Sequence, residues 1–169
     1  MTPLIRSLTT LPVIIGSFIL MVVIGMSFAP VQSAIDGPLL DMIWTGDAAR
    51  ARLNEMTEVQ KTAHFWGTIL NDTAYPLAYG AFFAGLAGRF APPRVTGLVM
   101  LPALMTVIAD LAENTVQALA LTGQPGLLTL KTVLTPLKFG LFLTAAILAL
   151  VLAIAAFVRW IMRRRGPSR

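Results

Sequence analysis

The sequence predicts an all-α integral membrane protein: a four-helix bundle with a short amphipathic helical segment outside the membrane, between helices one and two. Of its 169 residues, 56% are hydrophobic and 12% are charged, which is too apolar for a water-soluble domain of this length. The mean hydropathy of +0.77 agrees with this. Four segments also reach the roughly 20 apolar residues that a helix needs to cross a bilayer. We expect crossings over 8–29, 63–87, 95–121 and 134–158, in a single membrane domain spanning 1–169.

The first apolar segment follows Arg6 and has some character of a secretory signal, but two observations favour a retained membrane anchor. Its apolar run is longer than the h-region of a signal peptide. In addition, Gln32 occupies the minus-three position before Ala34, where a cleavage site carries a small residue. We therefore count this segment as the first crossing.

The basic residues predict how the chain is oriented. If the helices alternate in direction, one side of the membrane receives Arg6, Arg89, Arg94, Arg159, Arg163, Arg164, Arg165 and Arg169, and the other receives Arg50, Arg52, Lys61 and Lys131. Because basic residues accumulate on the cytoplasmic side, we expect both termini in the cytoplasm of a bacterial inner membrane. The formal net charge of +5 then reflects topology, and we expect no nucleic-acid partner, since no aromatic stacking positions alternate with the basic residues.

The only long polar stretch, 36–62, predicts a periplasmic amphipathic segment, with breaks at Gly37-Pro38 and Thr45-Gly46-Asp47 that can start short helices and an amphipathic helix over 48–64. Ala49, Leu53 and Met56 recur there at helical spacing among charged side chains. Two interpretations remain open. The segment is either a connector that packs Leu53 and Met56 on the bundle, or a lid over a functional site.

Charged and amide side chains stand inside three of the predicted crossings, where ionisable residues are costly and mark a functional site. On helix three, Asp110, Glu113, Asn114 and Gln117 share one face at i, i+3, i+4 and i+7. Helix two carries Thr68, Asp72, Tyr75 and Tyr79 on one face, and helix four carries Lys131, Thr135 and Lys138. The main candidates for binding a ligand or ion are Asp72, Asp110, Glu113, Asn114 and Lys138. The secondary candidates are His64, Thr68, Tyr75, Tyr79 and Gln117.

Three of the charged residues fall at similar depths in the membrane. At about 1.5 Å of rise per residue, Asp72 lies about 15 Å, Glu113 about 13 Å and Lys138 about 10 Å below the outer ends of their helices. Helix three runs opposite to the other two, so this agreement depends on the topology and not on the choice of residues. We predict a single site in the outer half of the bundle, reachable from the periplasm.

The predicted site holds more acids than bases. Four unpaired charged groups would cost on the order of 10 kcal/mol in the bilayer, so we expect them to meet one another. If Lys138 pairs with one carboxylate, two of the three acids remain without a base. Like charges crowded in a medium of low dielectric resist joint ionisation, so at least one acid is expected to carry a proton at neutral pH. This surplus favours a proton-exchanging or cation-binding site over a structural salt bridge, which remains the alternative.

Pro76 and His64 add weaker signals. Pro76 has no N–H for the carbonyl of Asp72, so an acceptor stays free beside the charged groups, although a harmless kink is the commoner consequence. His64, at the outer mouth of helix two, could shuttle protons or ligate a metal, but a lone histidine near an interface usually does neither.

The sequence excludes several classes of chemistry. It holds no cysteine, which rules out disulfides, thiolate metal sites and a cysteine nucleophile. It also lacks a phosphate loop, a zinc-binding H-E-x-x-H motif, a hydrolase elbow and a histidine pair for haem, so we predict no cofactor and no metal. Asp110 and Glu113 could form an acid and base pair, but no nucleophile or substrate-reading motif accompanies them. Whether the protein is an enzyme stays open.

Three segments carry a resemblance to a known group. They are Asn-Asp-Thr-Ala-Tyr-Pro-Leu-Ala-Tyr-Gly at 71–80, Asp-Leu-Ala-Glu-Asn at 110–114 and Leu-Lys-Phe at 137–139. As a set, they resemble a widespread group of small, uncharacterised bacterial four-helix inner-membrane proteins with D-x-x-Y-P on helix two, D-x-x-E-N on helix three and a lysine on helix four. The resemblance implies the fold and the polar cluster, and it implies no activity.

These observations predict a small integral membrane protein whose protonatable site binds a cation or the polar head of a lipid or isoprenoid. The alternative is a structural or assembly accessory subunit of a larger membrane complex, in which the cluster locks the helices together. The expected partners are the lipid bilayer, a lipid or cation ligand, and either another membrane protein or a second copy of the chain. A transporter is a weaker interpretation, because no inverted repeat is visible.

Overall fold

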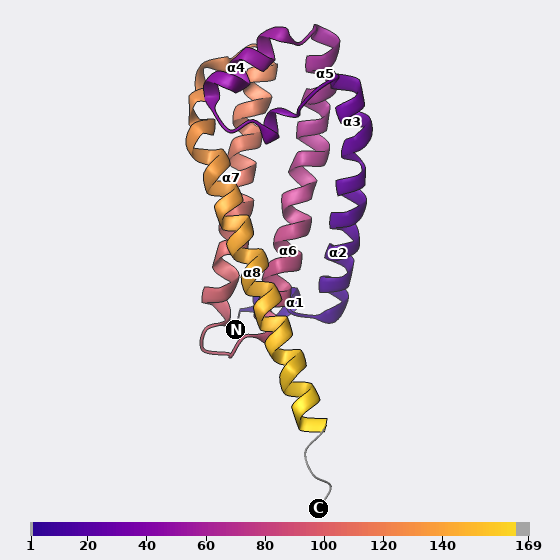
Figure 1. The fold of residues 1–169 in the computed structure, drawn as a ribbon, viewed down its shortest axis with the longest axis vertical. Helices are drawn as coiled ribbons and strands as arrows, with labels where there is room; N and C mark the ends of the chain where they lie inside the picture. Colours follow the sequence, from indigo (N-terminus) through magenta and orange to yellow (C-terminus); the bar gives the residue numbers. More distant parts are fainter. Residues whose placement is uncertain (1, 165–169) are drawn as a thin grey trace, which may run out of the picture.

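The computed structural model describes residues 2–164, and within this range the chain is all-helical with no strand. The all-α prediction is confirmed. Arg165 and Arg169, which were assigned to the cytoplasmic side, lie outside the described residues. The helices run mostly along the long axis of the molecule, and α8 extends past the others at the end where α1 lies (Figure 1).

The elements follow one another in this order: α1 (Pro3–Leu8), α2 (Leu11–Met26), α3 (Phe28–Ile35), the 3-10 turn η1 (Leu40–Met42), α4 (Gly46–Glu55), α5 (Glu58–Gly67), the π-helical turn η2 (Thr68–Asp72), α6 (Thr73–Phe90), α7 (Thr96–Leu121), the 3-10 turn η3 (Pro125–Leu130) and α8 (Lys131–Arg164).

Within residues 2–164, three helical stretches are long and apolar enough to cross a membrane: Leu11–Ile35, Thr96–Leu121 and Pro125–Arg164. The segment expected over 63–87 is helical but is not one of these three. It lies in a column formed by α5, η2 and α6, in which a π-helical turn and Asp72 interrupt the apolar run.

The first predicted helix, 8–29, differs from the helices observed. Pro12 lies in the first turn of α2, and Ser27 separates α2 from α3. The Ser27 hydroxyl donates to the carbonyl of Ile24 at 2.6 Å, a local bond that competes with the regular helix. Helical structure then continues to Ile35 and ends at Asp36, whose φ of 50° lies in the left-handed region that stops a helix.

The segment 36–62 holds η1, α4 and the start of α5, so the amphipathic helix expected over 48–64 is divided between α4 and α5. The Thr57 side chain caps α5 by accepting from the N–H of Gln60, and the Gln60 side chain in turn accepts from the Thr57 N–H at 2.9 Å. This capping box starts a new helix at Glu58 and explains why one amphipathic helix does not run through the segment.

The connector from η1 to α5 packs into one end of the molecule. Leu53 and Met56 are buried, as the connector interpretation predicts. They belong to a hydrophobic cluster that also contains Ile35, Leu40, Ala49, Val116, Ala120, Leu121 and Leu128. Gly46 lies so close to the backbone of η3 at Leu128 that no side chain fits there. In Figure 1 this layer of α4, α5 and the adjoining turns covers the end of the molecule opposite α1.

Along the long helices, α7 packs between α6 and α8, and α2 packs on α6. Small residues permit the contact between α6 and α7. Gly80 lies against Val107, and Gly88 lies against Met100, with no room for a side chain at either glycine. These close contacts bring the polar faces of α6 and α7 toward each other, and α8 packs on both helices.

Candidate functional site

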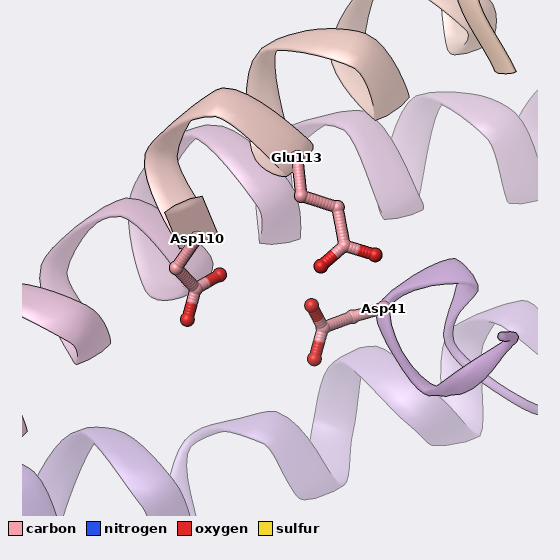
Figure 2. A group of neighbouring side chains, drawn as sticks. All are labelled: Asp41, Asp110 and Glu113. Atoms are coloured by element: carbon pink, nitrogen blue, oxygen red, sulfur yellow. The ribbon is translucent and has the colours of Figure 1, made fainter. Parts of the chain in front are cut away.

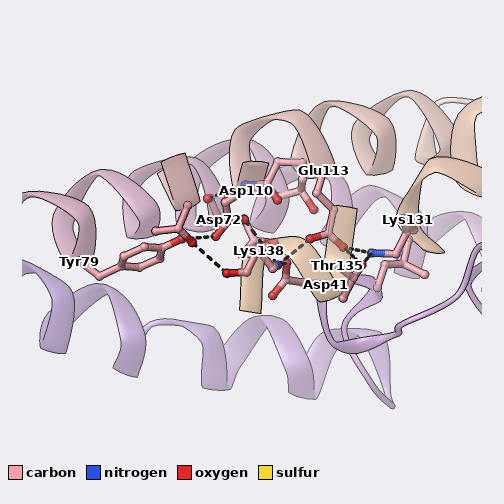
Figure 3. A network of polar contacts seen from close by, with 12 residues as sticks. Asp41, Asp72, Tyr79, Asp110, Glu113, Lys131, Thr135 and Lys138 are labelled. Atoms are coloured by element: carbon pink, nitrogen blue, oxygen red, sulfur yellow. Dashed lines mark hydrogen bonds and ion pairs between the residues drawn. The ribbon is translucent and has the colours of Figure 1, made fainter. Parts of the chain in front are cut away.

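Polar side chains from five elements gather in one network, shown in Figure 3. The ionisable members are Asp41 on η1, Asp72 at the end of η2, Tyr79 on α6, Asp110 and Glu113 on α7, and Lys131 and Lys138 on α8. The structure therefore unites all the main candidates predicted from the sequence and adds two residues to them, Asp41 and Lys131.

Lys138 lies at the centre of three carboxylates. Its Nζ forms ion pairs with Asp41, with Glu113 Oε2 at 2.7 Å and with Asp110 Oδ1 at 3.5 Å. Figure 2 shows the three carboxylates turned toward one another from η1 and α7. One oxygen of each lies within 4.8 Å of the others, a spacing that suits a metal ion. Because the Lys138 ammonium pairs with all three, it occupies the role that such an ion would have.

A second lysine completes the other side of Glu113. Lys131 is fully buried and forms an ion pair with Glu113, and it also donates to the hydroxyl of Thr135 at 3.3 Å. The Thr135 hydroxyl donates to Glu113 in turn. Lys131, Thr135 and Lys138 reach the same carboxylate because positions i, i+4 and i+7 share one face of α8. The two lysines thus form ion pairs with the two oxygens of Glu113, Lys131 with Oε1 and Lys138 with Oε2.

Asp110 is held from α6 by a tyrosine. Tyr79 is 2% exposed, and its hydroxyl donates to Asp110 Oδ2 at 2.7 Å. The other oxygen, Asp110 Oδ1, is buried and accepts no hydrogen bond from the described residues, with Lys138 at 3.5 Å as its ion-pair partner. Asp110 therefore keeps acceptor capacity on the side that faces Lys138.

Asp72 is bound through its backbone and not through its carboxylate. Pro76 cannot donate to the Asp72 carbonyl, and Asn114 on α7 supplies the missing donor at 2.6 Å. The free acceptor predicted from the sequence is thus satisfied by a side chain of the neighbouring helix. The Asp72 carboxylate has no hydrogen-bond or ion-pair partner within residues 2–164, although Asp72 is only 5% exposed.

His64 and Thr68 lie beside the network and hold η1 in place. The backbone N–H of Leu40 donates to His64 Nε2 at 2.8 Å, so this nitrogen carries no proton. The proton is then on Nδ1, which donates to the Thr68 hydroxyl at 3.2 Å. Both ring nitrogens of His64 are hydrogen-bonded. The bond to Leu40 positions η1, and with it the neighbouring Asp41, so the contribution of His64 to the site is structural.

The remaining secondary candidates differ in their surroundings. Gln117 is fully buried, and its side-chain amide has no partner among the described residues. Tyr75 packs edge-on against Tyr79, with ring centroids 5.4 Å apart, and lines the cavity described below.

A cavity of about 230 Å³ opens beside the network. Its lining residues are Asp41, Met42, Asp72, Tyr75, Tyr79, Asp110, Lys138, Phe139 and Phe142. Three carboxylates, one lysine and four aromatic rings thus face the same space. Met42 is exposed, and Tyr75, Phe139 and Phe142 are half-buried, so these residues mark the side on which the cavity opens.

Counted over the described network, four carboxylates meet two ammonium groups. The surplus expected from the sequence therefore persists although a second lysine has joined, because Asp41 joins as well. Sequence reasoning did not select Asp41, because a single acid in a polar connector is normally solvated. Only its position after the Gly37-Pro38 break, in a turn held by His64, brings it to the site.

Over the described residues, the fold and site define an all-helical protein with three stretches able to cross a membrane and a buried acidic network open to a small cavity. No protein-family model matches the chain, and comparisons with curated proteins and with solved structures find no match.

Proposed function

We propose that the chain is a four-helix integral membrane protein of a bacterial inner membrane whose buried acidic network binds a cation or the polar head of a lipid or isoprenoid. The column of α5, η2 and α6 is the second of the four crossings along the chain. It is as long as its neighbours and packs between α2 and α7. With both termini in the cytoplasm, the network lies in the outer half of the membrane, and η1 and α4 lie on the periplasmic side.

The observation that carries this proposal is the carboxylate of Asp72. It lines the cavity, it is nine-tenths buried, and no described side chain pairs with it. A charged acid at the centre of a membrane helix costs about 3 kcal/mol on insertion scales, and an unpaired one recovers none of that cost inside the protein. A proton or a cationic ligand bound by Asp72 would neutralise its charge and remove this energetic cost.

The charge balance supports the same conclusion. A network that served only to lock helices would need equal numbers of acids and bases. The surplus of two carboxylates instead lies among Asp41, Asp72 and Asp110, which line the cavity together with Lys138. The proposed ligand therefore carries positive charge or delivers protons to the cavity.

Native mass spectrometry of the full chain, released from lipid nanodiscs, tests the proposal. The wild-type protein should carry a bound small molecule, lipid or cation, and the Asp72→Asn variant should lose it. The control is Glu55→Gln, which neutralises an acid whose side chain is 70% exposed. If Asp72→Asn retains the same adducts as the control, the cavity is not the binding site and the proposal fails.

The second candidate is a structural accessory subunit of a larger membrane complex. Its support is that the ion pairs of Lys138 join three elements, η1, α7 and α8. In addition, the outward faces of α2 and α8 carry many exposed apolar side chains. This candidate predicts co-purification of a stoichiometric partner after mild extraction, and it predicts that the partner remains bound when Asp72 is neutralised.

A further inference from the structure

The aromatic lining of the cavity narrows the kind of cation that it can take. Tyr75, Tyr79, Phe139 and Phe142 contribute rings to the same space that Asp72 and Asp110 reach. Tyr79 and Phe142 meet edge to face, with centroids 5.0 Å apart. Carboxylates together with aromatic rings are the groups that recognise an ammonium ion attached to an apolar body.

The protein already displays this recognition with its own side chain. The Nζ of Lys138 lies 5.1 Å from the centroid of the Phe139 ring while it pairs with Asp41, Asp110 and Glu113. An ammonium group is thus stable here between carboxylates and an aromatic ring. The Asp72 carboxylate lines the same cavity as Phe139, and no described side chain pairs with it.

A metal ion fits the space less well. The cluster with suitable spacing, formed by Asp41, Asp110 and Glu113, is already paired with the Lys138 ammonium. A hard cation such as Ca²⁺ or Mg²⁺ needs six or more oxygen ligands or retained waters. The part of the cavity around Asp72 offers mostly aromatic carbon in their place. An anion is excluded by the surplus of carboxylates.

The size and opening of the cavity indicate how much of the ligand it encloses. At about 230 Å³ it is smaller than the roughly 300–1,000 Å³ of pockets that enclose a whole drug-sized molecule. Its mouth is lined by Met42, which is 56% exposed, and by half-buried rings. The cavity therefore suits a charged head, with an apolar remainder leaving through the mouth.

We propose that the cavity binds an organic ammonium ion, with the protonated amine between the carboxylates of Asp72 and Asp110 and its apolar part on Phe139, Phe142 and Met42. This inference rests on the proposed function and specifies its ligand. The amine belongs either to a free hydrophobic amine or to the head group of an aminolipid such as phosphatidylethanolamine.

Three probes test the inference on the full chain in detergent. They share a phenyl group on a short alkyl chain and differ in the charge of the terminal group. They are N,N-dimethyl-4-phenylbutylamine, 4-phenylbutanol and 4-phenylbutyrate. We expect the amine alone to raise the melting temperature, by about 5 °C at saturation. We also expect Asp72→Asn to weaken the amine response at least tenfold while Glu55→Gln retains it. Equal responses to amine and alcohol, or an unchanged response in Asp72→Asn, would overturn the inference.

A second measurement does not depend on the stability of the Asp72 variant. The chain has no cysteine, so Met42→Cys places one reactive thiol at the mouth, and Val59→Cys places one on an exposed part of α5 as the control. The amine should slow maleimide labelling of Met42→Cys at least threefold and leave Val59→Cys unchanged. Equal labelling rates with and without amine in both variants would place the amine elsewhere and overturn the inference.

Nanodiscs distinguish the two sources of the amine. If an aminolipid is the ligand, the probe should protect Met42→Cys in phosphatidylglycerol discs and lose this effect in phosphatidylethanolamine discs. If the ligand is a free amine, protection should be the same in both. An adduct that disappears in Asp72→Asn by mass spectrometry, together with no response to the amine probe, would leave the proposed function standing and refute the amine alone.

Discussion

The carboxylate of Asp41 on η1 forms an ion pair with the ammonium of Lys138 on α8, 97 positions further along the chain. This pair fastens the connector between α3 and α4 to the polar face of α8. It also makes the connector part of the site, since Asp41 and Met42 line the cavity. The segment packs through Leu53 and Met56, as the connector interpretation predicts, and it reaches the cavity through Asp41, while its role as a lid stays a prediction.

Removing the charge of Asp41 should weaken the attachment of the connector to α8 at a moderate cost in stability. The Asp41 side chain is 17% exposed, and Lys138 keeps Asp110 and Glu113 as partners. We expect Asp41→Asn to lower the free energy of unfolding by about 1–2 kcal/mol, less than the 3–5 kcal/mol typical of a broken buried pair. Thermal unfolding in detergent measures this. In the Met42→Cys background, Asp41→Asn should also speed maleimide labelling, and an unchanged rate would show that the pair does not close the mouth.

Glu113 should be the most costly acid to neutralise. It is fully buried, and Glu113→Gln leaves Lys131 without a carboxylate partner. We expect a loss of about 3–5 kcal/mol. The double variant Glu113→Gln/Lys131→Met removes the stranded charge, so it should recover at least 2 kcal/mol of this loss. A double-mutant cycle from unfolding curves measures the coupling, and additive effects would contradict the pairing.

The hydrogen bond from Leu40 to His64 predicts an ordered series of variants. His64→Leu leaves the buried Leu40 N–H without an acceptor and should cost about 1–3 kcal/mol. In His64→Gln, the side-chain oxygen can take the position of Nε2, so this variant should retain more stability than His64→Asn, whose oxygen reaches only the position of Nδ1. Melting temperatures of the three variants give the order, and equal losses in the glutamine and asparagine variants would contradict the bond.

The bond from Asn114 to the Asp72 carbonyl compensates for Pro76, and the two residues should therefore be coupled. Asn114→Leu in the wild-type chain should cost about 1–3 kcal/mol, because the carbonyl is left without a donor. In a Pro76→Ala background, the alanine N–H can donate to the same carbonyl, so Asn114→Leu should cost at least 1 kcal/mol less. Unfolding measurements on the four proteins of the cycle test this. Equal costs in both backgrounds would show that the carbonyl is not the relevant contact.

The orientation of the chain can be measured because it lacks cysteine. Under the proposed topology, Val59→Cys, on the connector side, reacts in intact spheroplasts with a maleimide that does not cross membranes. Arg94→Cys, in the turn between α6 and α7, should react only after lysis. The opposite pattern would invert the topology and place the site near the cytoplasm.

Much of the site was predictable because helical periodicity fixes which residues share a face. The spacing of Asp110, Glu113 and Asn114 places them on one face of a helix, and the rise per residue places Asp72 and Lys138 at a similar level. Asp41 was not predicted as a site residue because η1 is too short to show a helical pattern of polar and apolar residues. The break at Ser27 escaped because its hydroxyl bonds to the helix backbone, a local effect that hydropathy does not register.

Composition and helical period were enough to predict a helical protein with apolar stretches long enough for a membrane, three of which are found within residues 2–164. They were also enough to predict more acids than bases on the polar helix faces. Which charges meet one another depends on the tertiary structure. It set Lys138 among three carboxylates, gave Glu113 two lysines, and left the Asp72 carboxylate facing a cavity. The reason is that pairing depends on the close approach of helices and on a connector that folds back over their ends, and these contacts arise between residues far apart in the chain.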